Sequence, residues 1–263
     1  MVHRKPKLVE IVTPAGRKKY LEILLPYIQK LFEKGDITRW NVCLNTTNLE
    51  DVGYIESLKK YSFVKVLYSK IPIGGKASLQ KFWEEFIDPE KIYVRMDDDI
   101  VFVDTGRFRD FINFRRENPH YFIVSANVIN NGLLNFLHQG MGVLPTTKCN
   151  YCYNSEVNVC STETVTTVHD TFLKKGVEPY LFPKWDLVRY EPFSINCFAV
   201  FGEDMARCKV PEQGELYLSS QKPKELGRIN SIFGGFVVSH FSFFTQKGRF
   251  DEGRILKGYK ELL

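Results

Sequence analysis

The sequence predicts an α/β fold with a mainly parallel, Rossmann-like central sheet that is flanked by helices. Short apolar runs alternate with amphipathic helical patterns through the first hundred residues, which is typical of such sheets. The 263-residue chain also has a globular composition, with 44% hydrophobic and 25% charged residues. Polar residues follow several of the apolar runs directly. In parallel sheets, ligands bind beyond these carboxyl ends of the strands.

The first half of the chain supplies the regular part of the pattern. Its expected strands are Leu8–Val12, Trp40–Leu44, Phe63–Leu67, Ile92–Val94 and Ile100–Val103. Apolar residues at helical spacing predict helices at Tyr20–Phe32, with Pro26 as a kink, and at Leu79–Ile87. Asn48 is the expected N-cap of a further helix that runs through Leu58.

The second half is less regular. Helices are expected at Phe108–Ile112 and Val165–Leu173, and strands at Tyr121–Ser125, Ile195–Phe201 and Phe236–Phe244. Residues 140–162 and 209–230 read as long polar loops, which are usually functional in compact domains. Because no repeat or linker interrupts the pattern, residues 1–263 are expected to form a single domain.

Charge and residue usage narrow the expected partners and compartment. Lys and Arg number 36 against 31 Asp and Glu, and this net charge of +5 is too small and dispersed to indicate nucleic-acid binding. No apolar run is long enough for a membrane span or a signal peptide. Six cysteines are too few for a disulfide scaffold. Since the sequon at Asn45–Thr47 lies at a strand end expected to face the ligand, a cytoplasmic location is the simpler expectation.

The most informative motif is the acidic triplet Asp97-Asp98-Asp99, which directly follows the fourth expected strand. Adjacent carboxylates repel one another in a buried setting and need an opposing charge. Residues alternate sides along a strand, so Asp97 and Asp99 share one face and Asp98 points to the other. Two carboxylates on one face are a suitable seat for Mg²⁺ or Mn²⁺ shared with phosphates. The alternative is an exposed acidic turn.

Several segments together resemble the GT-A glycosyltransferases, in particular a bacterial and viral group that uses nucleotide sugars. The resemblance covers nearly the whole chain, and its motifs are Thr13–Arg17, Asn45–Thr46, Tyr93–Val101, Asn127–Asn131, Cys197–Gly202 and Val237–Phe243. It implies a GT-A type fold with a smaller acceptor-side sheet. Residues 1–104 would be the nucleotide-sugar-binding half and residues 105–263 the acceptor-binding half.

The resemblance also implies a metal site and a nucleotide site. Asp97 and Asp99 match the family's Asp-x-Asp motif, and His240 is similar to the histidine that completes the metal site in many of these enzymes. From spacing alone, His240 could equally be a core histidine. The residues expected to contact the nucleotide sugar are Thr13, Arg17, Asn45, Lys76, Arg95, Asp97 and Asp98, with Thr46 beside Asn45 and Ser78 as a weaker candidate.

An inverting transferase needs a carboxylate base that deprotonates the acceptor hydroxyl. By the order of elements, Glu215 is the favoured candidate, and Asp204 and Glu212 are alternatives. Leu216 follows Glu215 where the family usually has a second acidic residue, which leaves the base and inversion itself open. Each of these carboxylates could instead interact with a helix N-terminus.

The main functional expectation is therefore a metal-dependent glycosyltransferase that uses Mn²⁺ or Mg²⁺ and a nucleotide sugar, most simply a UDP-sugar, on a glycan acceptor. A sugar-1-phosphate nucleotidyltransferase is the alternative with the same sheet and metal chemistry. That class usually has a glycine-rich signature after the first strand, where this chain has only Gly16. A non-catalytic carbohydrate- or nucleotide-binding module is the third possibility.

Three further features are weaker. Cys149, Cys152 and Cys160 with His169 could be drawn as a zinc site, but their spacing matches no standard zinc motif. His169 lies on an apolar helix face, which favours a core or pocket-lining role. Trp185-Asp186 is an acceptor candidate, and His138–Gly142 is either a turn or a place where backbone approaches the donor sugar.

Overall fold

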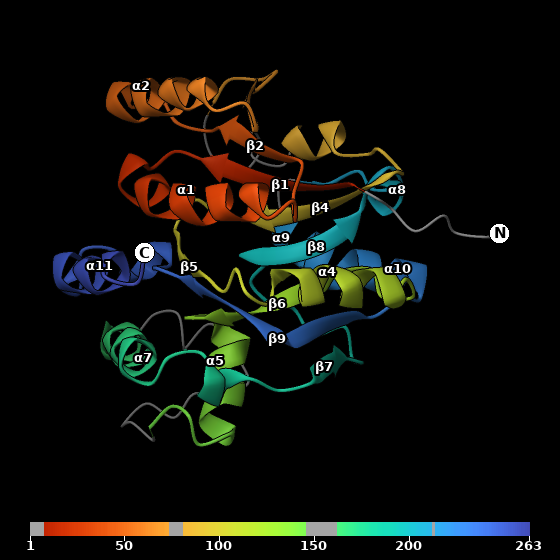
Figure 1. Cartoon of the computed structure of the whole chain (residues 1–263). Coiled ribbons are helices and arrows are strands. Elements are labelled where there is room, and N and C mark those ends of the chain that lie inside the picture. The colour runs from red at the N-terminus through yellow and green to blue at the C-terminus, as the bar shows by residue number, and fades with distance from the viewer. Residues whose placement is uncertain (1–7, 74–80, 146–161, 212–213) are drawn as a thin grey trace.

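The structure, a computed structural model, describes residues 8–73, 81–145, 162–211 and 214–263, and for residues 162 and 163 it describes the backbone alone. In these residues, nine strands form one curled sheet (Figure 1). The strands are β1 Leu8–Ala15, β2 Arg39–Leu44, β3 Val64–Tyr68, β4 Lys91–Met96, β5 Ile100–Val103, β6 Val124–Ile129, β7 Lys184–Leu187, β8 Cys197–Phe201 and β9 Asn230–His240.

The sheet order is β3-β2-β1-β4-β8-β6-β9-β5, and β7 pairs with β9 beside this path. Strands β1 to β4 are parallel to one another, and β9 is parallel to β6. Strand β8 runs antiparallel to both β4 and β6, so β6 has the direction of β4. The expected mainly parallel, Rossmann-like α/β fold is confirmed. The smaller acceptor-side sheet is a correction, because the second-half strands of the described chain join the same sheet through β8.

Helices flank this sheet, and α1 and α4 lie across one of its faces in Figure 1. The apolar side of α1 is buried along its whole length, which is why a helix containing Pro26 is held against the sheet. The helices are α1 Lys18–Glu33, α2 Leu49–Ser57, α4 Phe108–Glu117, α5 Gly132–Gly140, α7 Thr162–Lys175, α8 Gly202–Met205, α9 Gly214–Leu216, α10 Lys222–Leu226 and α11 Glu252–Lys260. Asn48 caps α2 as expected, since its side chain accepts hydrogen bonds from the N–H groups of Glu50 and Asp51.

Several expected elements differ from the structure. The helix expected at Leu79–Ile87 is a 3-10 helix at Phe82–Glu85 in the described residues, where Trp83 stacks on Phe198. The strand expected at Tyr121–Ser125 begins at Val124 and continues to Ile129. The expected loop 209–230 contains α9, a π-helical turn at Tyr217–Gln221 and α10. The three elements within residues 209–230 are short and polar, so their hydrophobic periodicity is too weak to predict them.

Strand β9 carries His240 and owes its path to two glycines. Its first residues pair with β7 and its last residues pair with β5, and its register with β6 shifts after Phe233. A Cβ on Gly234 would lie 2.1 Å from the Phe182 carbonyl oxygen, and one on Gly235 would lie 2.6 Å from the Phe233 ring. Only glycine fits there, and the resulting bulge directs the end of β9 toward β5.

Among the described residues, no helix has both the length and the apolar character needed to cross a bilayer. The assignment of residues 1–263 to one domain, and its division at residue 104, stays a prediction.

Candidate metal and nucleotide site

The acidic triplet lies in the tight turn between β4 and β5. Ile100 N–H donates to the Asp97 carbonyl at 3.1 Å and closes this turn. Neighbouring strands hold its backbone on both sides, because Asp97 N–H donates to the Asn196 carbonyl at 2.9 Å and Phe241 N–H donates to the Asp99 carbonyl at 2.8 Å. The triplet is therefore fixed at the carboxyl edge of the parallel strands, where ligands of such sheets bind.

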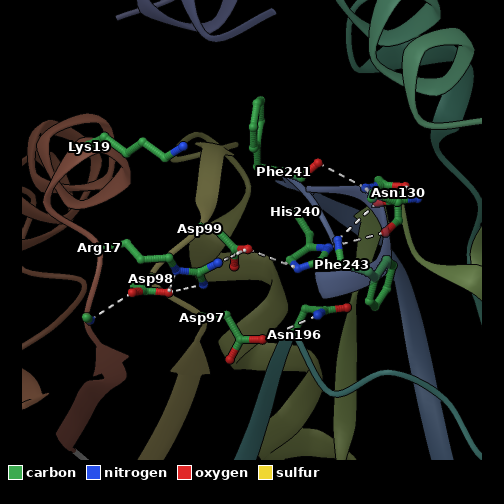
Figure 2. Close-up of polar contacts among 12 residues, drawn as sticks. Arg17, Lys19, Asp97, Asp98, Asp99, Asn130, Asn196, His240, Phe241 and Phe243 are labelled. Atoms are coloured by element: carbon green, nitrogen blue, oxygen red, sulfur yellow. Dashed lines mark hydrogen bonds and ion pairs between the residues drawn. The ribbon is translucent and has the colours of Figure 1, made fainter. Parts of the chain in front are cut away.

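Asp97, Asp99 and His240 converge at this edge, and one ligand atom from each lies within 4.8 Å of the others. His240 Nε2 is 3.4 Å from Asp99 Oδ2, and both side chains are buried (Figure 2). Asp99 Oδ1 is buried and accepts no hydrogen bond from the described part of the chain. A buried carboxylate oxygen without a donor is costly, and a divalent cation with oxygen and imidazole ligands would satisfy it. The three side chains thus fit a metal ion, as the spacing of the two aspartates and, for His240, the family resemblance led us to expect.

Asp98 points away from that cluster and binds the turn after β1 (Figure 2). It accepts from the Gly16 N–H at 2.8 Å and from Arg17 Nε at 3.0 Å, and a second Arg17 nitrogen also contacts it. Arg17 Nη1 donates to Asp99 Oδ2 at 2.9 Å, so one guanidinium bridges both carboxylates. Asp98 therefore points to a different side from Asp97 and Asp99, as expected, although the turn rather than a continuous strand separates them, and Asp98 anchors Arg17.

The charges of these buried groups depend on one another. Burial opposes ionisation of Asp99, but Arg17 and His240 outweigh it and hold the Asp99 pKa well below its usual range. Burial likewise tends to lower the pKa of His240, and the adjacent Asp99 carboxylate raises it instead. Burial raises the pKa of Asp98, although its hydrogen bonds from Arg17 and Gly16 favour the ionised form.

Asp97 is held by two further polar groups. Arg95 donates to Asp97 Oδ1 at 2.8 Å, and Asn196 Nδ2 donates to Asp97 Oδ2 at 3.3 Å. Arg95, one of the residues expected to contact the nucleotide sugar, is buried beside the triplet. Its direct partner in the structure is the Asp97 carboxylate.

The other expected nucleotide contacts have different positions. Asn45 and Thr46 lie against the turn after β1, since a Cβ on Gly16 would be 3.2 Å from the Thr46 Cβ. Thr13 is fully buried within β1, where its hydroxyl accepts a hydrogen bond from the Trp40 indole at 2.8 Å. That contact orients Thr13 toward the core. Lys76 and Ser78 lie outside the described residues.

The two described candidate bases are not brought to the triplet by any contact in the described chain. Asp204 is buried beyond the end of β8, next to the first residues of β4, and pairs with Arg228 at 2.5 Å and Arg115 at 3.4 Å. Glu215 is exposed on α9. The carbonyl of Ser219, four residues later, accepts a hydrogen bond from the Asn230 side chain at the start of β9, whereas His240 ends that strand. Glu212 lies outside the described residues.

His169 has the core position expected from its helix face. Its Nε2–H donates to the Phe241 carbonyl at 2.7 Å, and its Nδ1 accepts from the Tyr259 hydroxyl at 2.7 Å. Burial lowers its pKa to about 4, so it is neutral near pH 7. Both ring nitrogens are engaged within the core. Cys149, Cys152 and Cys160 lie outside the described residues, so the zinc alternative stays open for them alone.

The remaining candidates lie away from the triplet. His138 is on helix α5, rather than in a turn, and its Nε2 bonds the Asn127 side chain at 2.8 Å. Asp186, on β7, accepts from the hydroxyls of Tyr121 at 2.7 Å and Ser231 at 2.8 Å. Since Ser231 is near the start of β9, Trp185-Asp186 lies toward the opposite end of that strand from His240.

Two residues at the site were missed as individual candidates. Asn130 and Asn196 contact His240 and Asp97, respectively. The available signal was the Asn130-Asn131 pair at the end of an apolar run. Asparagine tolerates a positive φ and often marks such a strand end.

No known family model matches the chain, and no curated protein matches it significantly. Solved structures do. A CMP:2-keto-3-deoxy-manno-octonic acid synthetase complexed with CTP superimposes over 98% of this chain and 100% of its own, with a TM-score of 0.52 and 9% identity. A mycobacterial protein matches over 95% of this chain and 72% of its own, with a TM-score of 0.52 and 11% identity. A 4-diphosphocytidyl-2C-methyl-D-erythritol synthase from Anaerococcus prevotii matches over 98% and 96%, with a TM-score of 0.47 and 13% identity.

The two matches with a TM-score of 0.52 show that the chain shares its Rossmann-like fold with these structures. They also correct the main functional expectation, because the full-length match is to a CTP-bound synthetase. The expected glycosyltransferase is contradicted, and the UDP-sugar donor and glycan acceptor that accompanied it have no support. The nucleotidyltransferase, which was the alternative, fits the comparison better.

Proposed function

We propose that this protein is a metal-dependent nucleotidyltransferase that joins a nucleoside monophosphate to a sugar phosphate. The observation that carries the proposal is the convergence of Asp97, Asp99 and His240 beside Arg17 at the carboxyl edge of the sheet. This edge is where a nucleotide binds in Rossmann-like folds. The full-length similarity to a synthetase complexed with CTP supports the same class of reaction.

In the proposed reaction, an oxygen of the sugar phosphate attacks the α-phosphorus of a nucleoside triphosphate. A new P–O bond forms, the bond to the bridging oxygen breaks, and pyrophosphate leaves with the electron pair. The attacking phosphate is already ionised at neutral pH, because its second pKa is about 6. The reaction therefore needs no carboxylate base, which agrees with the distance of Asp204 from the triplet.

The chain's own residues would position and neutralise charge. Asp98 holds the Arg17 guanidinium in a fixed orientation, with Gly16 N–H on the same carboxylate. The Arg17 side chain is 29% exposed, so it reaches the site while keeping its link to Asp99. An oriented guanidinium suits phosphate oxygens well because its donors form a planar fork.

Asp97, Asp99 and His240 would hold Mg²⁺ or Mn²⁺, whose positive charge stabilises phosphate oxygens when the ion is bound. Arg95 and Asn196 bind Asp97 from the protein side and fix its orientation. His240 is buried, which excludes water from its side of the cluster. These residues keep the acidic groups together against their mutual repulsion.

The experiment is a pyrophosphate-release assay on the full chain. CTP, UTP, ATP, GTP and dTTP are each combined with a panel of sugar 1-phosphates in Mg²⁺, in Mn²⁺ and in a chelator. The proposal predicts metal-dependent pyrophosphate release with one combination, at a rate well above that of the triphosphate alone. A parallel arm supplies nucleotide sugars without a triphosphate. Turnover confined to that arm, or triphosphate binding without any turnover, contradicts the proposal.

A further inference from the structure

Two adjacent asparagines at the end of β6 lie behind the metal cluster. Asn130 and Asn131 are almost completely buried, with 0% and 1% of their surface exposed. Buried amides persist only where their hydrogen bonds are made. Asn130 bonds Phe241, the residue after the predicted metal ligand His240, and Asn131 bonds Asn196, which contacts the predicted ligand Asp97.

Asn130 holds the end of β9 (Figure 2). Its carbonyl accepts from His240 Nδ1 at 3.4 Å, and its side-chain amide donates to the Phe241 carbonyl at 3.0 Å. The same amide donates to Gln246 Oε1 at 3.1 Å, and this oxygen also accepts from Phe243 N–H at 3.0 Å. The residues that follow His240 are thus tied to the end of β6.

This contact also fixes which ring nitrogen of His240 faces Asp99. A carbonyl can only accept, so Nδ1 carries a hydrogen, and Nε2 faces Asp99, where a bound cation would replace the Nε2 proton. Histidines that bind metals commonly donate their other ring N–H to a carbonyl, which orients the ring and raises its basicity. The Asn130 carbonyl has this position because the backbone of Asn130 adopts a φ of 60°. This left-handed conformation is unfavourable by roughly 1–2 kcal/mol for a residue that has a Cβ atom.

Asn131 acts on the other side of the cluster, through Asn196. Its Nδ2 donates to Asn196 Oδ1 at 3.1 Å and to the Ser194 carbonyl at 2.9 Å. Because Asn196 Oδ1 is engaged in this way, its Nδ2 points to Asp97 Oδ2, 3.3 Å away. Asn131 also caps α5, since its Oδ1 accepts from Leu134 N–H at 3.4 Å.

We propose that Asn130 and Asn131 are positioning residues of the metal site. Asn130 orients His240 directly, and Asn131 orients Asp97 by fixing the amide of Asn196. The inference rests on the proposed function, because it assigns a role toward the same divalent cation. Neither asparagine is proposed to touch the ion or a substrate.

The test measures Mn²⁺ affinity of the full chain by calorimetric titration, without nucleotide, together with the thermal unfolding midpoint. Asn131→Asp keeps an oxygen that can cap α5 but removes the donor to Asn196. The added negative charge by itself would tighten cation binding, so weaker binding isolates the loss of orientation. Asn196→Ala removes the donor to Asp97 and leaves the cap intact. Asn130→Gly retains the positive φ and removes the bonds to Phe241 and Gln246. Asn113→Asp, on the exposed surface of α4, is the matched charge control.

The expected result is a loss of about tenfold or more in Mn²⁺ affinity for each of the three site variants, as for other residues that orient metal ligands. Asn113→Asp should bind as the unchanged protein does. Equal Mn²⁺ affinity in folded Asn196→Ala and Asn130→Gly variants would overturn the inference and leave the proposed function standing. Failure of the unchanged protein to bind Mn²⁺ would overturn both.

Discussion

Two buried clusters of aspartate and arginine lie at opposite edges of the sheet. They differ in the ratio of carboxylates to guanidinium groups. At the opposite edge, both oxygens of Asp204 are engaged by Arg228, and Arg115 adds a further contact. Arg115 also stacks on the Phe201 ring, 3.7 Å from its centroid. Its unpartnered atom is a nitrogen, Nε, which no cation can satisfy.

At the carboxyl edge, by contrast, carboxylates outnumber guanidinium groups. Three carboxylates, Asp97, Asp98 and Asp99, face two guanidinium groups, Arg17 and Arg95. Among the described residues, two buried atoms there lack a hydrogen-bond partner: Asp99 Oδ1, an acceptor beside the imidazole of His240, and Arg95 Nη1, a donor. An excess of acceptors in a buried setting suits a cation. One edge therefore has the charge balance of a structural ion pair, whereas the other has the excess of carboxylates that the proposed metal site requires.

The largest expected effect comes from breaking the structural cluster. Asp204→Ala leaves Arg115 and Arg228 without their carboxylate, and breaking a buried pair in this way costs about 3–5 kcal/mol of unfolding free energy. Urea denaturation measures it. Asp170→Ala, which removes a surface pair with Arg254, is the control and should cost less than about 1 kcal/mol. Equal effects of the two would contradict the structural role of Asp204.

Asp99→Asn tests the other edge. It should lower the rate of pyrophosphate release at least 100-fold, about 2.7 kcal/mol in the barrier, because it removes a charged metal ligand. Its unfolding free energy should fall far less than that of Asp204→Ala. Asp110→Asn, at an exposed position on α4, should leave the rate unchanged. A fully active Asp99→Asn variant would remove the basis of the comparison.

His138 is buried outside both clusters and has no charged partner in the described part of the chain, and its protonation makes the stability of the fold depend on pH. Burial lowers the pKa of His138 to about 3, so protonation favours the unfolded chain, whose histidine has a pKa of about 6.5. This contribution to stability is present above pH 6.5 and is lost as the pH falls. Between pH 7 and pH 5 it should cost about 2 kcal/mol of unfolding free energy.

His138→Gln should flatten that part of the pH profile, as measured by denaturation at each pH. His120→Gln, at an exposed histidine, is its control and should keep the slope of the unchanged protein. If both variants give the same slope, acid destabilisation arises elsewhere.

The smallest expected effect is at Arg17. Lysine keeps the positive charge but has a single nitrogen in place of the planar guanidinium, whose separate nitrogens bind Asp98 and Asp99. Arg17→Lys should therefore raise the KM for the nucleoside triphosphate about tenfold, a change of ~1.4 kcal/mol. Steady-state kinetics checks this against Arg39→Lys on the protein surface. An unchanged KM would show that the bridge does not orient Arg17 toward phosphate.

The sequence predicts the β1–β5 region well because its strands are apolar and its turns have clear signals. Strand periodicity predicts that Asp97 and Asp99 share a side and that Asp98 does not; the structure shows this arrangement, but it is produced by the turn between β4 and β5. The resemblance to a known family implied that His240 lies beside Asp97 and Asp99, although it is 141 residues beyond Asp99 in the sequence. Strand spacing alone did not decide the role of His240.

The remaining features depend on long-range contacts that no local pattern records. The hydroxyl of Thr13 faces the Trp40 indole because of the packing between β1 and β2. Asp204 lies next to Arg228 because the segment before β9 returns to the end of β8. The prediction of a glycosyltransferase was wrong because local sequence patterns do not separate glycosyl transfer from nucleotidyl transfer. Both reactions use the same kind of sheet and the same metal chemistry. Pocket differences that separate them are worth only a few kcal/mol.

The most direct test of the central claim is anomalous diffraction at the manganese edge from crystals of the full chain grown with Mn²⁺ and CTP. We expect a manganese peak between Asp97, Asp99 and His240, with the CTP phosphates next to it and near Arg17. A manganese peak at another site, or CTP bound away from the carboxyl edge of the sheet, would contradict it.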